Sequence, residues 1–366
     1  MAPPSPQPGP ARTAPGSLAD TTREVLRLAA GHGDPARRPT VLVLSDGSSV
    51  LSRGDLGARA VRPVLERKCA VLERATGMNT LPLALARAEP VAYADTLRLL
   101  RPNYDAILLA DIAAPYCFEL QRLLAAPHIG CPVLHDDQHG TAVMTAAAVR
   151  TAVARSGRTL GELCAVVVGA GAAGSTTARL LHHLGTGEVR VVDSTGLLHP
   201  GRARLTPDKA ELAALTNPGG LRGPLGTALD GADVCVGLSG APIASEDLAR
   251  MNPKPVVVPL SYPDVEVRYE DAVALGATYL PALENDLSNN LATPGLLLAA
   301  CRLGLRQPSM RDLATAAGCL VSLSAARPDA PPDAPPLSGA DLGRTARAIA
   351  RAIADDRAPS SSFPER

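Results

Sequence analysis

The chain has 366 residues, a length that suits about two domains, and 46% of them are hydrophobic, which is ample for two packed cores. Lysine and arginine together number 36, as do aspartate and glutamate, so the formal net charge is zero, without the basic surplus of a nucleic-acid-binding protein. No apolar run approaches the roughly 20 residues of a membrane-spanning helix, and the opening segment MAPPSPQPGPARTAPG lacks the apolar centre of a secretory signal, so we expect a cytoplasmic protein without a membrane partner. Residues 1–17 are rich in proline, alanine and serine, and we expect them to be disordered.

Strand and helix patterns alternate through the next part of the chain. Short apolar runs that end in polar residues predict strands, and longer amphipathic stretches predict helices. The predicted helices cover 18–30 and 61–76, and the predicted strands cover 40–47, 105–111 and 132–137. An alanine-rich helix over 140–157 follows, and we expect it to lead into a second domain.

The second half of the chain continues this alternation. Residues 162–185 predict a strand, a tight turn and a helix, and further strands are predicted over 188–196, 231–240, 254–263 and 277–285. The proline-rich stretch 326–339 predicts a linker before a final helix over 340–355 and a polar tail. Strands that alternate with helices through short loops are typical of a parallel, doubly wound sheet.

The fold class predicted from this order is α/β. We expect an N-terminal α/β domain over 18–140 and a Rossmann-like domain with a doubly wound parallel sheet over 141–305. Residues 306–366 are expected to add C-terminal helices, the linker and the tail.

A glycine-rich turn, GAGAAG, joins a predicted apolar strand to a predicted helix. Gly169 allows the tight turn, Gly171 lets the backbone approach a pyrophosphate, and Gly174 lets the helix pack closely on the strand. The helix that follows offers unpaired N–H groups and the positive end of its dipole to phosphates. The candidate cofactor-binding turn is Gly169, Ala170, Gly171, Ala172, Ala173 and Gly174. The alternative is a ligand-free turn in an alanine-rich protein, which the full strand–turn–helix context disfavours.

The next predicted strand ends in Asp193, about 20 residues beyond the turn, where dinucleotide-binding proteins carry an acidic residue. A carboxylate there can accept a hydrogen bond from a ribose hydroxyl, and the simple rule then favours NAD over NADP. Ser194, Arg202 and Arg204 follow it and keep NADP open. Ser239, after a later strand, is a further candidate for contact with the cofactor. The expected cofactor is therefore NAD or NADP.

Polar side chains gather where the strands of the first half end. They are Asp46, Asp111 and the run His135, Asp136, Asp137, Gln138 and His139. Ligands bind beyond the carboxyl ends of parallel strands, and adjacent aspartates repel each other unless a cation or hydrogen bonds offset the repulsion. Because Mg²⁺ and Mn²⁺ prefer oxygen ligands, Asp111 and Asp137 are candidate metal ligands. The alternative, aspartates that cap helices in a solvated turn, stays open on these residues alone.

Lys68 lies in the mostly apolar stretch VLERKCAVL. A desolvated lysine can have its pKa lowered enough to act as a general base. A surface lysine on an amphipathic helix is the commoner outcome, and this stretch by itself favours it. The seven cysteines form no CxxC pair and their number is odd, so we expect small buried side chains and assign them neither a metal nor a disulfide.

Segments of the chain, taken in order, match a known pattern. They are SDGSSVLSRGDLG, PVLERKCAVLERATG, LLADIAAPYCFEL, PVLHDDQHGTA, VVVGAGAAG, VVDSTGLL, ADVCVGLSG and NNLATPGLLLA. The match covers roughly residues 40–305, and HDDQHGTA leading into GAGAAG is its most specific part. On these segments the chain resembles the malic enzymes, the oxidative decarboxylases of malate, and in particular the shorter bacterial ones.

The resemblance implies NAD(P)-dependent oxidative decarboxylation of malate to pyruvate with the help of a divalent cation, Mg²⁺ or Mn²⁺. Lys68 matches the family's base lysine, and Asp136 matches the aspartate beside the metal ligands. Asp111 and Asp137 match two of the family's metal ligands. Asn290, with Asn289 beside it, matches the asparagine that contacts substrate. The resemblance also suggests a homodimer.

The chain departs from the family pattern at several positions. Ala110 stands where the family has a glutamate before its metal-ligand aspartate, so one of three carboxylate ligands is missing. The family's catalytic tyrosine has no counterpart before Thr40, Tyr262 replaces an asparagine, and Arg53 lies in a loop where the family has leucine. Two functions therefore stay open: an impaired malic enzyme, or a protein that binds NAD(P) as a sensor or partner subunit. A dehydrogenase without a metal is a third alternative, which the Asp136–Asp137 pair disfavours.

Overall fold

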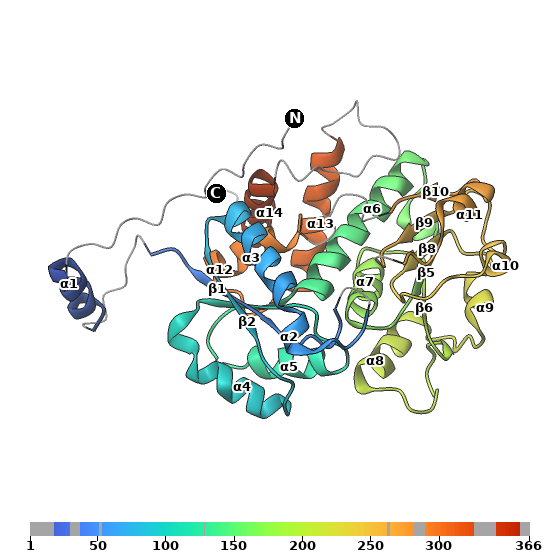
Figure 1. The fold of residues 1–366 in the computed structure, drawn as a ribbon. Helices are drawn as coiled ribbons and strands as arrows, with labels where there is room; N and C mark the ends of the chain where they lie inside the picture. The colour runs from blue at the N-terminus through green and yellow to red at the C-terminus, as the bar shows by residue number, and fades with distance from the viewer. Residues whose placement is uncertain are drawn as a thin grey trace, which may run out of the picture. The chain divides into compact units, whose positions relative to one another are not determined.

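The computed structural model describes residues 18–29, 37–50, 53–127, 129–261, 264–281, 290–325 and 342–358 (Figure 1). It divides into two units, Met1–Arg38 and Pro39–Arg366. The first unit contains α1 (Leu18–Ala29), which confirms the helix predicted there as far as Ala29. The predicted disordered tail 1–17 and the predicted linker 326–339 lie outside the described residues.

The second unit begins with a parallel four-stranded sheet. Its strands are β1 (Thr40–Ser45), β2 (Asn79–Ala84), β3 (Ala106–Leu109) and β4 (Val133–His135), in the order β2-β1-β3-β4. Strands β1, β3 and β4 confirm the prediction, although each ends two residues earlier than expected. The edge strand β2 was not predicted, because it contains Pro82 and none of its side chains is fully buried. An edge position tolerates a proline, which has no N–H to donate to a neighbouring strand.

Side chains of β1 alternate between two hydrophobic cores, as the period of a strand requires. Val41 and Val43 face the core that includes α3 (Arg62–Thr76), whereas Leu42 and Leu44 face a second core. That second core includes α4 (Pro90–Leu99) and α5 (Tyr116–Leu124). Both faces of the first sheet are therefore covered, as is usual for parallel sheets.

The second sheet has the order β10-β9-β8-β5-β6-β7. Its strands are β5 (Cys164–Val168), β6 (Glu188–Asp193), β7 (Gly196–Leu197), β8 (Val234–Gly237), β9 (Val256–Pro259) and β10 (Thr278–Tyr279). All neighbours are parallel except β7, which pairs antiparallel with β6. After β5, the chain adds β6 on one side of that strand and later adds β8 on its other side. The order in which strands are added therefore reverses at β5, while β5, β6 and β8 remain parallel. This topology confirms the predicted α/β fold class.

Helices cover both faces of the second sheet. Alternate residues of the central strand show this, because Ala165 and Val167 belong to the core shared with α7 (Ala172–His183), and Val166 and Val168 belong to a third core. The remaining helices of this sheet are α8 (Pro207–Thr216), α9 (Leu225–Leu229), α10 (Ser245–Leu248) and α11 (Tyr269–Ala274). A doubly wound arrangement of this kind places ligands beyond the carboxyl ends of its strands.

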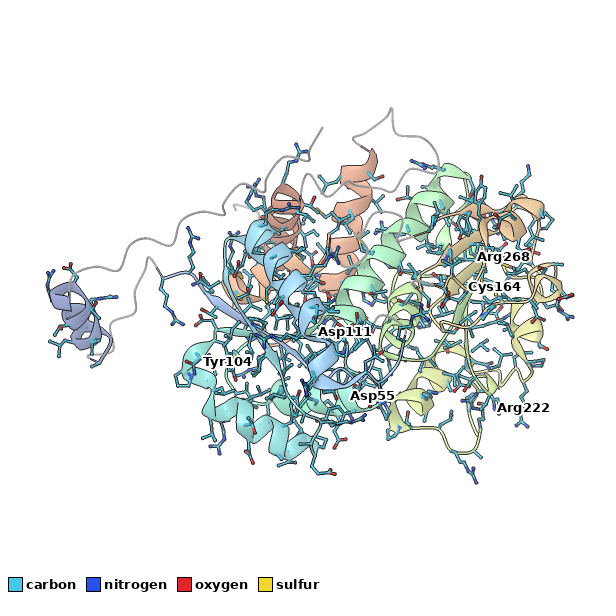
Figure 2. The ribbon with its side chains drawn as sticks, viewed as in Figure 1. Asp55, Tyr104, Asp111, Cys164, Arg222 and Arg268 are labelled. Atoms are coloured by element: carbon cyan, nitrogen blue, oxygen red, sulfur yellow. The ribbon has the colours of Figure 1, made fainter. Side chains whose placement is uncertain are left out.

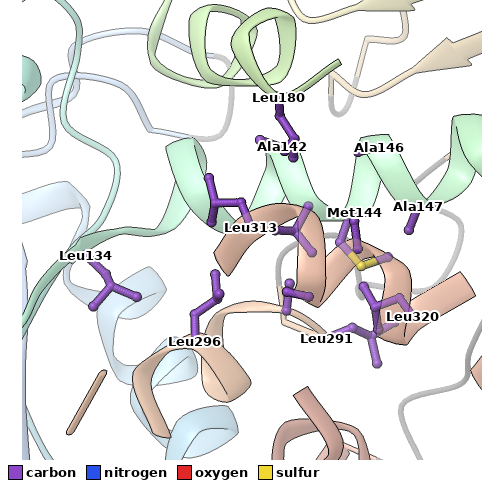
Figure 3. Close-up of a cluster of buried hydrophobic side chains, with 14 of the residues drawn as sticks. Leu134, Ala142, Met144, Ala146, Ala147, Leu180, Leu291, Leu296, Leu313 and Leu320 are labelled. Atoms are coloured by element: carbon purple, nitrogen blue, oxygen red, sulfur yellow. The ribbon is translucent and has the colours of Figure 1, made fainter. Parts of the chain in front are cut away.

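One long helix, α6 (Thr141–Arg155), lies between the two sheets and packs on both α7 and α13 (Figure 1). The C-terminal part of the chain forms α12 (Thr293–Leu303), α13 (Met310–Ala325) and α14 (Leu342–Arg357), which pack on one another. Two of these helices, α12 and α14, also pack against α3. Figure 3 shows the resulting core, in which Leu180 of α7, Ala142 of α6 and Leu313 of α13 lie close together. Because this core is continuous, the two sheets are held as one packed body.

The described residues include no helix that is long and apolar enough to span a membrane. All seven cysteines are free thiols, and most of them are buried. Burial raises the pKa of the Cys131 thiol to about 11 and that of the Cys164 thiol to about 12. These side chains therefore behave as small hydrophobic residues at neutral pH.

Candidate active site

The carboxyl ends of β3 and β4 bring three aspartates together. The strands are neighbours, so Asp111, just beyond β3, meets the single π-helical turn η2 (Asp136–Gly140) that follows β4. The backbone N–H of Asp111 donates to the carboxylate of Asp137 at 3.2 Å. Asp111 itself has a positive φ of 54°, a conformation that costs energy for a residue other than glycine and that clusters at functional sites.

Lys68 reaches this cluster from α3. Its Nζ forms an ion pair and a hydrogen bond with the carboxylate of Asp136 and lies 4.0 Å from Oδ2 of Asp111. The side chain of Lys68 is 14% exposed and that of Asp136 is 3% exposed, so the alternative of a solvated surface lysine is wrong. The site thus joins a residue of α3 to residues at the ends of two strands.

The pKa of Lys68 moves in the direction opposite to the one expected for a desolvated lysine. Burial would lower this pKa, but the carboxylates of Asp136, Asp111 and Asp137 together outweigh burial and raise it. The expectation considered only removal from water, whereas the fold adds three negative charges around one ammonium group. Lys68 is therefore protonated in the described state.

Thr293 is a second partner of Asp136 and was not singled out from the sequence. Its hydroxyl donates to Oδ1 of Asp136 at 2.5 Å, and both side chains are buried. Thr293 is the first residue of α12, so the contact brings the chain entering that helix to the cluster. Asn290 is half-buried three positions earlier, whereas its predicted companion Asn289 lies outside the described residues. The only hint in the sequence was the position of Thr293 inside the NNLATPG segment.

The two histidines of the His-Asp-Asp-Gln-His run are buried scaffold residues. Nδ1 of His139 accepts a hydrogen bond from the backbone N–H of His135 at 3.1 Å, which fixes the turn between β4 and α6. Burial lowers the pKa of His135, and burial and the neighbouring His135 lower the pKa of His139 to about 3. Both rings are neutral at neutral pH, so the ionised groups of this run are its aspartates.

The structure does not support helix capping by Asp136 or Asp137. The N-cap residue of η2 is His135 and that of α6 is Gly140, so neither aspartate occupies a capping position. The carboxylates of Asp136 and Asp137 instead accept from Lys68, Thr293 and the backbone of Asp111. Asp46 at the end of β1 does stabilise a turn, because its Oδ1 accepts from both the N–H and the hydroxyl of Ser48.

A cavity of about 760 Å³ opens beyond the carboxyl ends of β5, β6 and β8. Its walls come from the glycine-rich turn, the end of β6, the start of α8, the loop after β8 and the segment after Asp111. The residues that line it include Gly169, Ala170, Gly171, Asp193, Lys209 and Ser239. The volume is in the range of cavities that hold small-molecule cofactors.

The three glycines of the turn are required for different reasons. Gly169 has a φ of +117°, and a Cβ there would lie 2.5 Å from the carbonyl oxygen of Leu238. A Cβ on Gly174 would lie 1.8 Å from the carbonyl oxygen of Gly169, so α7 could not start so close to β5. A Cβ on Gly171 would meet nothing within 4 Å, so this glycine borders open space. The first and third glycines therefore serve packing, and the second leaves room for a ligand.

The N-cap residue of α7 is Gly171, which has no side chain to accept from the N–H groups of the first turn. Gly169, Ala170 and Gly171, which lead into α7, line the cavity, so the positive end of the helix dipole lies beside a place that suits a pyrophosphate. Asp193 lines the same cavity from the end of β6. Hydrogen bonds from Arg202, Lys209 and Thr195 outweigh the effect of burial and hold the pKa of Asp193 well below its usual range.

Glu266 is a buried carboxylate that sequence inspection missed. It accepts from the backbone N–H groups of Ser239 at 2.9 Å and Gly240 at 3.1 Å, and from the hydroxyl of Ser261. Glu266 therefore ties the loop after β8, which lines the cavity, to Ser261, two residues beyond the end of β9. No local pattern marked it, because its partners lie in two loops that only the fold brings together.

The aspartate cluster and the cavity adjoin each other. Ala114, Pro115 and Phe118, which follow Asp111 in the chain, form part of the cavity wall. The turn η2 packs against α7. In Figure 2, Asp111 lies in the middle of the molecule, between the elements of the first sheet and those of the second. A molecule bound beside Lys68 would therefore lie next to a second molecule bound in the cavity.

Comparison with known proteins decides the family. A family model described as "Malic enzyme, NAD binding domain" matches residues 138–279. A bifunctional malic/malolactic enzyme of Bacillus subtilis is 35% identical over 266 residues, 71% of this chain and 65% of that protein. An NADP-dependent malic enzyme of Halomonas elongata is 35% identical over 300 residues, 77% of this chain and 68% of that protein. The chain belongs to the malic enzyme family.

Solved malic enzymes share the fold of this chain. An NAD-dependent malic enzyme of Thermotoga maritima is 28% identical, with a TM-score of 0.78 over 96% of this chain and 95% of that one. The resemblance inferred from the sequence motifs is thereby confirmed. The chain spans about two thirds of the length of the curated malic enzymes it matches, 65% for that of Bacillus subtilis and 68% for that of Halomonas elongata.

The donor set of this malic enzyme family member fits a divalent cation only in part. Asp111, Asp136 and Asp137 surround one ammonium group, so the formal charge of the cluster is three minus one, or −2, which favours a further cation. Mg²⁺ is often held by one or two carboxylates, with water and substrate oxygens completing its shell. Ala110 is fully buried and offers no ligand, and the described residues include no group of three His, Cys, Asp or Glu placed to hold a metal.

Arg53 and Tyr262 are two other departures from the malic enzyme pattern. Arg53 forms an ion pair with Asp264 at 3.3 Å, in which both side chains are more than half exposed. This contact joins the loop after β1 to the segment after β9. Tyr262 and Pro263 lie outside the described residues.

Proposed function

We propose that this chain catalyses the NAD(P)-dependent oxidative decarboxylation of malate to pyruvate. The observation that carries the proposal is the buried ion pair of Lys68 and Asp136, with Asp111 beside it, next to a cavity built for a dinucleotide. Membership of the malic enzyme family supports the same chemistry. The named relatives include both NAD-dependent and NADP-dependent enzymes, so the family alone permits either cofactor.

We assign the dinucleotide to the cavity beside the glycine-rich turn. The N–H groups at the start of α7 would hold its pyrophosphate, and the loop carrying Ser239 would border its nicotinamide half. Asp111 and Asp137 would hold a divalent cation. Bound there, the dinucleotide would supply a hydride acceptor for C2 of malate, and the cation would supply positive charge to offset the negative charge left by the loss of CO₂.

Lys68 and Asp136 would move the proton of the malate hydroxyl. Nζ of Lys68 donates a hydrogen bond to one carboxylate oxygen of Asp136, and the hydroxyl of Thr293 donates to the other. Because Lys68 is protonated in the described state, it must release that proton before it can accept another from substrate. Asn290, with Asn289, would contact the bound malate from the start of α12.

A second function is supported by one observation. Ala110, fully buried where the family carries a glutamate, removes one carboxylate ligand, which would leave a protein that binds NAD(P) as a sensor or partner subunit without decarboxylation. Following the absorbance of reduced nicotinamide with malate and Mn²⁺ separates the two functions. Turnover that Lys68→Ala removes supports the malic enzyme, whereas tight NAD(P)H binding without turnover supports the sensor.

The missing ligand gives a direct test of the metal site. We expect Ala110→Glu to raise the affinity for Mn²⁺ by about tenfold, because a third carboxylate would join Asp111 and Asp137. Ala110→Gln is the matched control, since it adds similar bulk without the charge. Mn²⁺ titration followed by electron paramagnetic resonance measures all three proteins. Equal affinities for the wild type and the glutamate variant would show that the metal site lies elsewhere.

We also propose the functional division of the chain. Residues 18–140 would form the catalytic domain, 141–305 the NAD(P)-binding domain, and 306–366 the C-terminal helices, linker and tail. The packing of α12 and α14 against α3 supports a role of the C-terminal helices in holding the catalytic part together. A homodimer and a cytoplasmic location stay predictions, which sedimentation and cell fractionation would test.

A further inference from the structure

The loop over residues 238–243, which follows β8, forms one wall of the dinucleotide cavity. The loop residues that line the cavity are Leu238, Ser239, Ala241, Pro242 and Ile243. The loop also lies directly against the glycine-rich turn, because a Cβ on Gly169 would meet the carbonyl oxygen of Leu238 at 2.5 Å. A shift of this loop would therefore change the shape of the cavity beside β8.

Glu266 supplies most of the hydrogen bonds that fix the backbone of this loop. Its Oε1 accepts from the N–H groups of Ser239 at 2.9 Å and Gly240 at 3.1 Å. Its own backbone carbonyl accepts from the N–H of Ile243 at 2.8 Å. One residue thus binds the loop both near its start and at its end.

The remaining N–H groups of the loop have partners nearby in the fold. The N–H of Leu238 donates to the carbonyl oxygen of Val168 at 2.8 Å, and that of Ala241 donates to Oγ of Ser239 at 3.2 Å. Pro242 has no N–H, so the six residues of the loop offer five such groups. Glu266 binds three of these five, two through its carboxylate and one through its carbonyl.

The carboxylate of Glu266 lies behind the loop and not in the cavity. Glu266 is 2% exposed and does not belong to the described residues that line the cavity. A Cβ on Gly237 would lie 2.7 Å from its carboxyl carbon, so the carboxylate fills space that this glycine at the end of β8 leaves free. Ser261 also donates to it, through its hydroxyl to Oε1 and through its N–H to Oε2 at 3.3 Å. Glu266 can therefore act on a bound cofactor only through the loop.

The order of the strands indicates which half of a dinucleotide meets the loop. The ends of β6 and β8 lie on opposite sides of β5, whose end carries the glycine-rich turn. A dinucleotide with its pyrophosphate at this turn extends one half toward β6 and the other toward β8. The acidic residue at the end of the strand after the turn, here Asp193, marks the side of the adenosine ribose. The nicotinamide half then lies beside the loop after β8.

We propose that Glu266 is a positioning residue for hydride transfer. By holding residues 238–243 in one conformation, it fixes the wall against which the nicotinamide half binds; this role rests on the dinucleotide site and the malate oxidation proposed above. A preformed wall lowers the entropy cost of ordering the loop on binding, and the placement of the nicotinamide sets the distance that the hydride must cross. Without the carboxylate, the N–H groups of Ser239 and Gly240 would lose their acceptor, and the loop would rearrange to satisfy them.

Calorimetric titration of the full chain with a dinucleotide, and with the matching fragment that lacks nicotinamide, tests this role. The pair is NAD⁺ and ADP-ribose, or NADP⁺ and 2′-phospho-ADP-ribose if NADP⁺ binds more tightly. Glu266→Met removes the carboxylate at similar side-chain length. We expect it to weaken dinucleotide binding by about tenfold and to leave fragment binding within about twofold. Glu270→Met, at an exposed position four residues further along, is the matched control and should change neither affinity.

Malate deuterated at C2 tests the hydride step at saturating cofactor. In Glu266→Met, kcat for malate oxidation should fall by about tenfold or more, because a misplaced nicotinamide slows hydride transfer. The deuterium isotope effect on kcat should rise above that of the wild type for the same reason. A loss that came only from weaker folding would leave this isotope effect unchanged.

Two milder variants guard against a variant that does not fold, which thermal unfolding would reveal. Glu266→Gln keeps an acceptor at Oε1, where the hydrogen bonds from Ser239, Gly240 and the Ser261 hydroxyl meet, and should recover most of the affinity that Glu266→Met loses. Ser261→Ala removes a donor to Glu266 and an acceptor for the N–H of Gly240 at 3.0 Å. It should cause a smaller loss of dinucleotide affinity, again without a loss of fragment affinity.

The outcomes separate the positioning role from the dinucleotide site itself. Unchanged dinucleotide affinity in Glu266→Met and Ser261→Ala, or an equal loss for dinucleotide and fragment, would overturn the positioning role while leaving the site intact. A glutamine variant as weak as the methionine variant would overturn it as well. Absence of wild-type binding to both dinucleotide and fragment would overturn the dinucleotide site, and the role of Glu266 with it.

Discussion

The dinucleotide cavity and the aspartate cluster are assembled in different ways. The glycine-rich turn lies within residues 169–174, and its geometry follows from neighbouring residues along the chain. In the aspartate cluster, Lys68 and Asp136 are 68 positions apart and Asp136 and Thr293 are 157 positions apart. The first site therefore depends on local backbone geometry, and the second depends on the packing of whole elements. The two sites should respond differently to substitution.

The largest expected effect is at Lys68. Lys68→Ala should lower kcat for malate oxidation by about 10²–10⁴-fold, the usual range for loss of a proton-transfer group. The dissociation constant for the dinucleotide should stay within about twofold, because Lys68 does not line the cavity. Steady-state kinetics and calorimetry measure the two effects, with Lys254→Ala as the control for loss of a lysine. A variant that keeps more than about a tenth of wild-type kcat would remove Lys68 from the chemistry.

A pair of substitutions inside the turn sharpens the contrast. Gly171→Leu should abolish measurable dinucleotide binding and leave the melting temperature near that of the wild type, because its side chain would enter open space. Gly174→Ala should instead lower the stability by about 1–3 kcal/mol, because its Cβ would overlap a backbone oxygen. Calorimetry and thermal unfolding compare the two variants. If Gly171→Leu still binds the cofactor, the turn is not the pyrophosphate site.

The same difference explains how much the sequence predicted. The strands β1, β5, β6, β8 and β9 follow from apolar runs, and the turn follows from three glycines at fixed spacing. The edge strand β2 was not predicted because Pro82 interrupts its pattern, and the helices α4 and α5 were not predicted because their patterns are short. Local signals therefore identified the central elements and missed those at the edges.

The candidate site was predicted unevenly for the same reason. The sequence pointed to Asp111, Asp136 and Asp137 because they end strands, but Lys68 was favoured only through the family resemblance. Its raised pKa depends on carboxylates from other elements, which no local pattern could show. Thr293 and Glu266 were missed because each is defined by partners far away in the sequence.

Thr293 offers an intermediate test of the long-range site. Thr293→Val keeps the shape of the side chain and removes the hydrogen bond to Asp136, which should lower kcat by about tenfold and leave KM for the dinucleotide unchanged. Thr293→Ser retains the hydroxyl and should restore most of the activity. Steady-state kinetics of the three proteins separates this positioning role from a packing role, because a packing role predicts that the serine variant is the weaker of the two.

The smallest expected effect concerns the C-terminal helices. Asp312 of α13 is 1% exposed and accepts two 2.6 Å hydrogen bonds from Arg357 of α14. Burial would raise the pKa of Asp312, but the hydrogen bonds from Arg357 and Ser309 outweigh burial and lower it. The pair therefore stabilises the fold fully above the unfolded pKa of about 3.9, and this contribution is lost as pH falls through the lower folded pKa.

Urea unfolding at pH 7 and below pH 4 measures this contribution. We expect Arg357→Met to lower the free energy of unfolding at pH 7 by about 1–3 kcal/mol and to reduce the loss of stability on acidification. Arg351→Met, at an exposed position of the same helix, is the control and should change the stability by less than about 0.5 kcal/mol. An unchanged stability of Arg357→Met at pH 7 would show that the pair does not hold α14 in place.

The central claim is that the aspartate cluster and the dinucleotide cavity act on one molecule of malate. Incubating the chain with malate labelled with ¹³C in the carboxyl group beside C3, NADP⁺ or NAD⁺, and Mn²⁺ tests it directly, with ¹³CO₂ and reduced cofactor measured together. We expect equal amounts of labelled CO₂ and reduced cofactor from the wild type, and neither product from Lys68→Ala. Reduced cofactor without labelled CO₂, or neither product from the wild type, would contradict it.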